Sequence, residues 1–139
     1  MDRVSDLVKR PPLSIPPGTS VRDAARVMYD NGVGSIIIVL EGKPVGVFTE
    51  RDLLRLVAMG VSLEARVEEF MSRNVVAVKT SDSIIKAATL MSEKRIRHLP
   101  VVDEKGELVG VISIRDIVEY LSKLAAERLA EAEMREFTG

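Results

Sequence analysis

The sequence predicts an α/β fold, of the α+β kind, in which two βαββα units pack with pseudo-two-fold symmetry and precede a long C-terminal helix. The first observation is an internal repeat, because residues 4–58 and 67–121 carry the same order of apolar and polar segments. The second is the closing line of each repeat, GKPVGVFTERD at residues 42–52 and GELVGVISIRD at residues 106–116. Each repeat alone is near the lower size limit for an adequate core, so we expect the two to pack together.

Each repeat is expected to begin with a short helical turn, followed by a short strand at a sheet edge. These turns and strands are expected at residues 5–8 and 13–16 in the first repeat and at residues 68–71 and 75–78 in the second. Pro11 and Pro12 block a helix between the first turn and its strand. The tripeptide Pro16-Pro17-Gly18 then ends that strand.

The next element of each repeat is an amphipathic helix, expected at residues 20–30 and 83–94. Ser20 and Asp23 give the first helix a weaker form of the N-terminal capping box, and Asn31-Gly32 ends it. Apolar residues at helical spacing mark the buried faces. They are Val21, Ala24, Ala25, Val27 and Met28 in the first helix and Ile84, Ala87, Ala88, Leu90 and Met91 in the second.

A β-hairpin and a second helix complete each repeat. One run in each repeat is apolar on both faces, which indicates a buried strand, and it leads through a tight turn into a partner strand. The strands are expected at residues 35–40 and 45–48 in the first repeat and at residues 99–102 and 109–112 in the second. Helices follow at residues 50–59 and from Ile114 onward, and residues 60–66 form a connector short enough to keep the units in contact.

The last helix is expected to outlast the second repeat and to continue to residue 136. Its apolar face consists of Leu121, Leu124, Ala125, Leu129 and Ala132. A helix that outlasts its domain usually packs on that domain or on a partner, and we favour a dimer contact. The sequence therefore divides into a first repeat at residues 1–60, a second repeat at residues 61–122 and a helical extension at residues 123–139.

The composition excludes several classes of function. The 139 residues are 46% hydrophobic and 29% charged, which is an ordinary globular balance, and no apolar run reaches membrane-spanning length. The net charge of −1 gives no general attraction to nucleic acid. The chain has no cysteine, so disulfides and thiolate catalysis are excluded, and we expect a cytoplasmic protein. His98 is the only histidine and has no second soft ligand beside it, so no metal site is expected.

The corner between the last strand and the last helix of each repeat carries the most chemistry. Thr49 and Ser113 fall at the N-cap of the following helix, and Asp52 and Asp116 fall three residues later. One interpretation is a capping box, in which each carboxylate accepts the N–H of the cap. The other is a ligand site, because a helix N-terminus attracts phosphate and a carboxylate there can accept both hydroxyls of a ribose. The corners recur at equivalent places, so we expect them to face one another across a shared cleft.

A basic cluster, Lys94-Arg95-Ile96-Arg97-His98, lies between the first helix of the second repeat and its buried strand. A basic helix end can simply complement the helix dipole, and for Lys94 alone this explanation is the better one. Three cations and a histidine beside a cleft would also suit a polyphosphate. The equivalent residues 31–35 of the first repeat are uncharged, so we expect the two sites to differ in affinity or ligand.

A nucleotide base also needs an apolar slot, and the two short strands are candidates for it. Exposed backbone in these strands would bond to the edge of a purine, while Ile15 or Val78 packs on its face. The alternative is that both side chains belong to the hydrophobic core.

Together these features resemble a tandem pair of CBS domains, also called a Bateman module. The resemblance covers residues 4–121 and rests on residues 98–103, 106–111 and 113–116 of the second repeat and on residues 35–39, 42–47 and 49–52 of the first. The first repeat departs from the family pattern where Ile37 takes the place of the proline found at Pro100. It also departs where Leu40-Glu41 replaces an Asp-Glu turn.

The resemblance implies two clefts, one per repeat, that bind adenosine ligands such as AMP, ADP, ATP or S-adenosylmethionine, with no obligatory cofactor. In the family pattern the corner Thr or Ser and its Asp hold phosphate and ribose, and basic residues before the second strand meet the phosphates. The nucleotide-binding residues that we expect are Ile15, Thr49, Asp52, Val78, Lys94, Arg95, His98, Pro100, Ser113, Arg115 and Asp116. Family members also commonly form dimers.

We therefore expect a regulatory module that forms a homodimer and passes a ligand-driven conformational change to an unidentified partner protein. We expect no enzyme, because the sequence has no P-loop, no Rossmann fingerprint and no Ser-His-Asp arrangement. The first alternative is a structural homodimerisation module whose corners are caps only. The second is nucleic-acid binding through the basic cluster with Lys9 and Arg10, which the near-zero net charge argues against.

Overall fold

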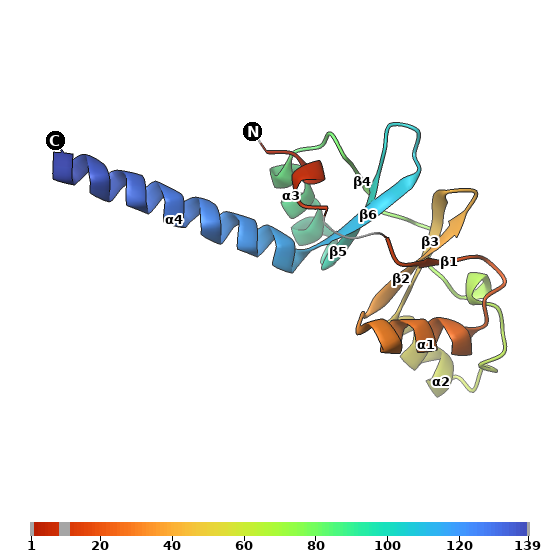
Figure 1. The fold of residues 1–139 in the computed structure, drawn as a ribbon. Coiled ribbons are helices and arrows are strands. Elements are labelled where there is room, and N and C mark those ends of the chain that lie inside the picture. The colour runs from red at the N-terminus through yellow and green to blue at the C-terminus, as the bar shows by residue number, and fades with distance from the viewer. Residues whose placement is uncertain (1, 9–11, 139) are drawn as a thin grey trace.

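The computed structural model describes residues 2–8 and 12–138 and contains two three-stranded sheets, ordered β1-β2-β3 and β4-β5-β6 (Figure 1). In each sheet the first two strands are parallel and the last two are antiparallel. The elements in chain order are the 3₁₀ turn η1 (Val4–Asp6), β1 (Ser14–Ile15), α1 (Val21–Asn31), β2 (Ser35–Leu40), β3 (Lys43–Thr49), α2 (Glu50–Ala58), the 3₁₀ turn η2 (Val67–Glu69), β4 (Val78–Lys79), α3 (Ile84–Lys94), β5 (His98–Val102), β6 (Leu108–Ser113) and α4 (Ile114–Thr138). The predicted fold, two βαββα units and a long C-terminal helix, is confirmed.

Local capping explains where the first helix of each repeat begins and ends. The Ser20 hydroxyl accepts the backbone N–H of Asp23 at 3.0 Å, and the Ser83 hydroxyl accepts that of Lys86 at 3.1 Å. α1 ends at Gly32, whose φ of 64° is a left-handed conformation that glycine adopts without strain. Both helices therefore lie where the sequence predicts them.

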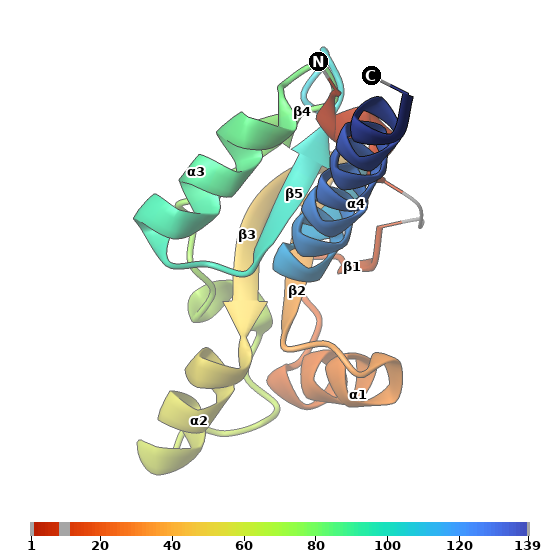
Figure 2. The ribbon, with the colours of Figure 1, turned by 90° about the vertical axis from the view of Figure 1, so that its left-hand side faces the viewer.

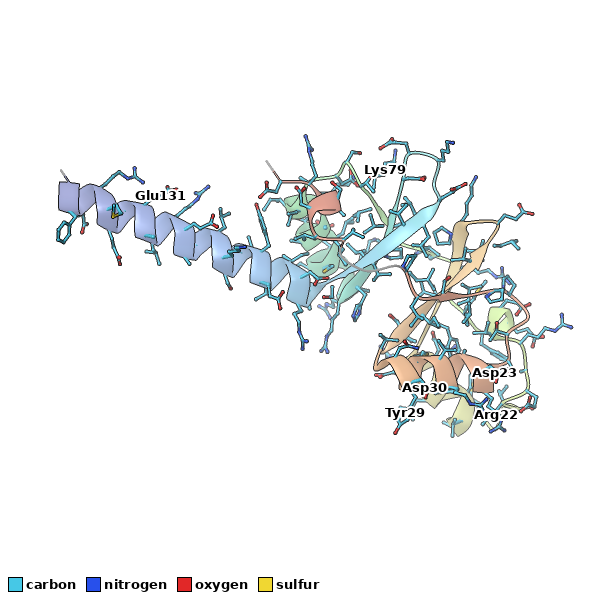
Figure 3. The ribbon with its side chains drawn as sticks, in the orientation of Figure 1. Arg22, Asp23, Tyr29, Asp30, Lys79 and Glu131 are labelled. Carbon is cyan, nitrogen blue, oxygen red and sulfur yellow. The ribbon has the colours of Figure 1, made fainter. Side chains whose placement is uncertain are left out.

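The connector at residues 60–66 is hydrogen-bonded to the start of α1 in the first unit. Val21 N donates to Ala65 O at 2.9 Å, and Arg22 N donates to Leu63 O at 2.9 Å. The Arg22 side chain, labelled at the start of α1 in Figure 3, lies 2.8 Å from the Glu64 carboxylate. The connector is thus part of the first unit and not a free link.

The strand predicted at residues 75–78 is shorter and begins later than expected, because β4 comprises only Val78–Lys79. The residues before it are still crossing from one unit to the other. Ser72 exchanges both backbone hydrogen bonds with Val47 of β3, each at 2.9 Å. The chain therefore pairs with the first sheet at Ser72 and reaches the second sheet only at Val78.

Each unit is closed by the leading turn of the other. The core of the second repeat contains Val4 and Leu7, which come from the start of the chain. The core of the first repeat contains Val67 and Met71, which begin the second repeat in the sequence. Val4 N also donates to Asp82 O at 2.8 Å, so the exchange is fixed by backbone bonds as well. The division of the chain at residue 60 remains a prediction about the sequence repeat, because the packing crosses it.

One glycine in each hairpin makes room for the exchanged turn. A methyl group on Gly110 would overlap the Val8 side chain, and a methyl group on Gly46 would overlap the Met71 side chain. The two glycines hold equivalent places in the two closing lines of the sequence. Glycine leaves room at both places for the turn that crosses the strand, and the branched Val8 beside Gly110 can yield less than the flexible Met71 beside Gly46.

The faces of the sheets that point away from the cores are also partly apolar. Ile36 and Ile38 belong to the core of the first repeat, so Ile37 between them points to the opposite face of the sheet. It is nevertheless only 5% exposed. Pro100 holds the equivalent place in β5 and is buried too. Figure 2 shows α1 and α2 beside the first sheet and α3 beside the second. The backbone of Leu108 donates to Gly42 O at 2.8 Å, so the two hairpins are in contact.

The helix α4 extends well beyond the second repeat (Figure 1). At its base Ile117 is buried in the second core, and the Tyr120 hydroxyl donates a hydrogen bond to the Asp2 carboxylate. Farther along, Leu129 is 65% exposed, and Figure 3 shows Glu131 on a part of the helix that stands clear of both sheets. The end of the helix does not pack on its own domain, and the expected dimer contact stays a prediction.

Neither α4 nor any other helix in the described part of the chain is long and apolar enough to cross a membrane. In α4 the apolar residues are interrupted by charged ones, among them Glu127, Arg128 and Glu131.

We predict that replacing Gly110 by alanine lowers the free energy of unfolding by about 1–3 kcal/mol, because the added methyl group overlaps the branched Val8 side chain. Gly46→Ala should cost less, since the flexible Met71 side chain can move aside. Denaturant unfolding measures both changes. In the control, Val8→Ala removes the overlap, so the double variant should be more stable than the two single changes imply. If the changes in unfolding free energy of Gly110→Ala and Val8→Ala simply add in the double variant, the close contact between these two residues is contradicted.

Candidate functional site

The corner of the first repeat is a complete capping box at the start of α2. Thr49 N donates to Asp52 Oδ2 at 2.9 Å, and Asp52 N donates to the Thr49 hydroxyl at 3.2 Å. The same hydroxyl donates to Asp52 Oδ2 at 3.1 Å. The second carboxylate oxygen, Oδ1, lies 3.5 Å from Nη2 of Arg55. Both oxygens of Asp52 are therefore engaged within the protein.

The corner of the second repeat forms the same box but leaves one carboxylate oxygen open. Ser113 N donates to Asp116 Oδ2 at 2.8 Å, and Asp116 N donates to the Ser113 hydroxyl at 3.2 Å. Glu119 stands where the first repeat has Arg55. Within the described part of the chain, Asp116 Oδ1 takes part in no hydrogen bond or ion pair. This oxygen is available to accept the hydroxyl groups of a ligand.

The second sheet brings the basic cluster to this corner. His98 pairs directly with Ser113 in the ladder between β5 and β6, and Ile114 N donates to Arg97 O at 2.8 Å. The exposed members of the cluster are Lys94, Arg95, Arg97 and His98. None of them forms a salt bridge with another described residue. The positive charges beside the helix N-terminus are thus free to meet an anion.

Arg95 adopts a backbone conformation that an arginine rarely takes. Its φ is 55°, in the left-handed region, at the C-cap of α3. The first repeat has Gly32 at the equivalent cap. A residue with a Cβ atom costs about 1–2 kcal/mol in this conformation. Strain of this kind tends to be kept where the side chain has a task, which supports a functional role for Arg95.

The surroundings of His98 lower the pKa of its imidazole. Partial removal of the imidazole from water lowers the pKa of His98 below the ordinary value of 6.5, and the nearby Arg97 lowers it further. Asp116 acts in the opposite direction and raises it, but the lowering effects are larger. A phosphate at this corner would favour the protonated imidazole.

The first repeat has the same backbone at its corner but different side chains. Ser35 pairs with Thr49 in the ladder, and Glu50 N donates to Gly34 O at 2.9 Å. A methyl group on Gly34 would lie 3.2 Å from the carboxyl carbon of Glu50, so this carboxylate covers the glycine. The two corners therefore share a frame and differ in charge.

The structure separates the expected site residues into groups. Ser113, Asp116 and His98 come together at one corner. Lys94 and Arg95 are exposed at the end of α3, close in sequence to it, and Arg115 is exposed on the first turn of α4. Thr49 and Asp52 form a second group. Among the described residues no hydrogen bond or ion pair links the two corners. The shared cleft that we expect between them stays a prediction.

Three of the expected site residues lie in the interior. Ile15 and Val78 are 6% and 1% exposed and belong to the two hydrophobic cores. The alternative that both side chains are core residues therefore holds in this structure. Pro100 is buried as well. β1 and β4 are each paired on one side only. β1 can offer a base its free backbone edge, whereas in β4 Lys79 N donates to Asp82 Oδ2 at 2.9 Å and Lys79 O accepts from Asp82 N at 3.0 Å. The buried side chains of both strands cannot reach a base without moving.

Two residues that distinguish the corners were not singled out from the sequence. Arg55 reaches Asp52, and Glu119 replaces it in the second repeat. The signal was available, since each stands three residues after the corner aspartate, on the same helix face. In the described part of the chain, no group of three or more His, Asp or Glu side chains is arranged to hold a metal ion. Lys9 and Arg10 lie outside the described residues.

A shallow depression lies beside the first corner, along α2. It is lined by Arg51, Asp52, Leu54, Arg55 and Ala58. A second depression, on the extension of α4, is lined by Ala130, Glu131, Met134 and Arg135 of that helix alone. Each depression is lined by residues of a single helix, and only the first adjoins a corner.

Comparison with known proteins agrees with the sequence pattern. The family model for the CBS domain matches twice, at residues 4–59 and 67–123. An uncharacterized protein of Methanopyrus kandleri is 34% identical over 137 residues, which cover 96% of this chain and 69% of the relative.

Two solved structures show the same fold with ligands bound. A CBS domain protein from Pyrobaculum aerophilum complexed with AMP matches with a TM-score of 0.79 and 36% identity, covering 88% of this chain and 99% of that chain. A second CBS domain pair, in complex with 5′-methylthioadenosine and S-adenosyl-L-methionine, also has a TM-score of 0.79, at 28% identity. That match covers 88% of this chain and 98% of the other.

We predict that His98, the only histidine, titrates with a pKa below 6.5 in the folded protein. Asp116→Asn should lower that pKa further, because the carboxylate favours the protonated ring, whereas Arg97→Gln should raise it. NMR of the single imidazole resolves all three titrations. Because the folded protein then binds fewer protons than the unfolded chain, His98 should make it less stable as the pH falls through 6.5. A wild-type midpoint at or above 6.5 would contradict this description of the corner.

Proposed function

This chain belongs to the CBS domain family, and on that premise we propose that it is a regulatory module that binds adenosine nucleotides beside its repeat corners. The second-repeat corner is the stronger nucleotide site. The observation that carries the proposal is the open Oδ1 of Asp116, half-buried at the start of α4 and flanked by unpaired cations.

The corner offers separate partners for the sugar and for the phosphate. Asp116 uses Oδ2 to cap α4 and keeps Oδ1 for the hydroxyl groups of a ribose. The phosphate lies against the Ser113 hydroxyl and the first N–H groups of the helix, where the helix dipole favours negative charge. Arg95, Lys94 and His98 complete its charge balance. Arg115, exposed on the same turn, is a further partner for phosphate oxygens.

The adenine base lies along the backbone of β1 in the first repeat and of residues 76–77, just before β4, in the second, because the outward backbone groups of Lys79 in β4 are bonded to Asp82. Val78 and Ile15 set the position of these strands from inside the cores, and Pro100 supports the neighbouring strand. Thr49 and Asp52 hold a ligand at the other corner, where Asp52 Oδ1 gives up its 3.5 Å contact with Arg55 to accept the ribose. AMP, ADP and ATP are the ligands considered for the basic corner, and the relatives complexed with AMP and with S-adenosyl-L-methionine support an adenosine class.

Regulation follows from the position of α4 in the chain. Its first turn is the ligand corner, and its last turns stand free of both sheets (Figure 1). A nucleotide that favours one orientation of the corner changes the population of helix positions, and a partner protein senses that change. Such a sensor acts in the cytoplasm, where free adenine nucleotides are held. No catalytic reaction is part of the proposal.

The module acts as a homodimer. Leu54 and Val57 of α2 are 70% and 58% exposed, and Val118 and Leu121 at the equivalent places of α4 are 53% and 42% exposed. Monomeric proteins rarely leave apolar side chains of this size at adjacent positions on a helix. A second copy that covers both surfaces removes them from water, and the pseudo-symmetry of the repeats suits a two-fold contact.

A structural homodimerisation module without nucleotide binding is the second candidate. The observation in its favour is that both corners are complete capping boxes, so Asp52 and Asp116 already have a structural task. This candidate does not account for the left-handed Arg95, or for Lys94, Arg95 and Arg97, which form no ion pair with a described residue and have no charged counterpart at the first corner.

We predict that AMP raises the melting temperature of the wild-type protein and binds in calorimetry, because a ligand of the folded state stabilises it by mass action. Asp116→Asn should weaken this binding about tenfold to a hundredfold, since a charged hydrogen-bond acceptor is lost. The amide oxygen can still cap α4, so the fold should persist, and Asp103→Asn in the β5–β6 turn is the matched control. If AMP shifts neither quantity in folded, ligand-free protein, the structural candidate replaces the nucleotide sensor.

A second prediction concerns the homodimer. Val57→Glu should convert the dimer into a monomer, because a buried, unpaired carboxylate opposes the contact. Light scattering coupled to size-exclusion chromatography gives the mass directly. Ser92→Glu, which adds the same charge on exposed α3, should leave the dimer intact. A wild-type protein that is monomeric in this measurement would refute the proposed contact.

A further inference from the structure

We infer that Glu50 makes the first-repeat corner select adenosine compounds without a phosphate, whereas the second-repeat corner selects phosphorylated ones. This inference rests on the proposed function, because it assigns a ligand class to one of the two adenosine sites. Glu50 was not among the residues expected from the sequence to contact a ligand.

Glu50 and Ile114 hold the same place in the two corners. Each is the first residue of the helix that follows the corner Thr or Ser. Glu50 N donates to Gly34 O at 2.9 Å, and Ile114 N donates to Arg97 O at 2.8 Å. A ligand bound in the same orientation at both corners therefore meets a carboxylate in the first repeat and an aliphatic side chain in the second.

The Glu50 carboxylate lies over Gly34, the residue just before β2. A methyl group on Gly34 would be 3.2 Å from its carboxyl carbon and 3.3 Å from each carboxylate oxygen. Arg97 is the second-repeat equivalent of Gly34, as the two backbone bonds show. The place from which an arginine extends in the second repeat is thus covered by a negative group in the first.

The remaining charges reinforce this contrast. Arg51 and Arg115 are both exposed at equivalent positions, so they do not distinguish the corners. Arg55 faces Asp52, with 3.5 Å between the charged atoms, and is partly neutralised there. The first corner has no counterpart of Lys94, Arg95 or Arg97, because residues 31–35 carry no charge. A phosphate dianion is therefore disfavoured at the first corner relative to the second.

The adenosine part of the ligand is common to both corners, because both have the capped aspartate. What differs is the group at the 5′ position of the ribose. An uncharged thioether or a cationic sulfonium group tolerates the Glu50 carboxylate, and the cation is attracted by it. The first-repeat corner accordingly takes adenosine compounds whose 5′ group is neutral or positive.

The test isolates each corner and uses two probes, AMP and 5′-methylthioadenosine, in isothermal titration calorimetry on the full chain. In Asp116→Asn protein, in which the second corner is impaired, 5′-methylthioadenosine should bind at least about tenfold more tightly than AMP. Adding Glu50→Gln should raise the affinity for AMP about tenfold and leave that for 5′-methylthioadenosine unchanged. Glu127→Gln on exposed α4 removes the same charge far from the corner and should change neither.

The outcomes separate this inference from the proposed function. If Asp116→Asn protein binds both probes equally, or if Glu50→Gln leaves AMP binding unchanged, the inference is overturned and the nucleotide module stands. If Asp52→Asn does not abolish the binding of 5′-methylthioadenosine, that compound binds elsewhere and the inference is again overturned. A wild-type protein that binds neither probe overturns the proposed function together with the inference.

Discussion

The exchange of leading turns between the two repeats is the contact on which the rest of the structure depends. Val4 and Leu7 complete the second core, and Val67 and Met71 complete the first. Each core is completed by residues of the other repeat, so each unit depends on the other for its packing. The exchange is possible because the hairpin strands carry glycine where the turns cross them. Function at the corners is thus tied to packing at a distance from them.

The two repeats share one backbone arrangement at their corners, and the side chains around it differ in charge. Both corners cap a helix with a hydroxyl and a carboxylate, and in both one backbone bond joins the helix start to the residue just before β2 or β5. Around the second corner lie exposed cations and an aspartate oxygen that no described residue contacts by a hydrogen bond or ion pair. At the first corner the Glu50 carboxylate lies over Gly34, and Arg55 lies beside Asp52. A pair of equivalent sites can in this way respond to two related ligands.

Much of the fold could be predicted from the sequence, because local signals recorded it. The repeat, the serine caps and the two-sided apolar runs gave the elements within a few residues. The exchange could not be predicted, since residues 5–8 and 68–71 look alike and nothing local says which core each turn joins. The late start of β4 follows from that long-range crossing. For the site, the corner pairs and the basic cluster were visible, and the ladder that sets His98 beside Ser113 brings them together. The burial of Ile15 and Val78 and the position of the Glu50 side chain depend on tertiary packing, which no sequence pattern specifies.

The central claim is that a nucleotide is held by the second-repeat corner through Asp116 and the adjoining cations. A crystal structure of the full chain grown with AMP tests it most directly. The account predicts ribose hydroxyls within hydrogen-bond distance of Asp116 Oδ1 and phosphate oxygens against the Ser113 hydroxyl and the Arg95 or His98 side chain. AMP bound only at the Thr49–Asp52 corner, or crystals in which Asp116 Oδ1 contacts solvent alone at saturating AMP, would contradict it.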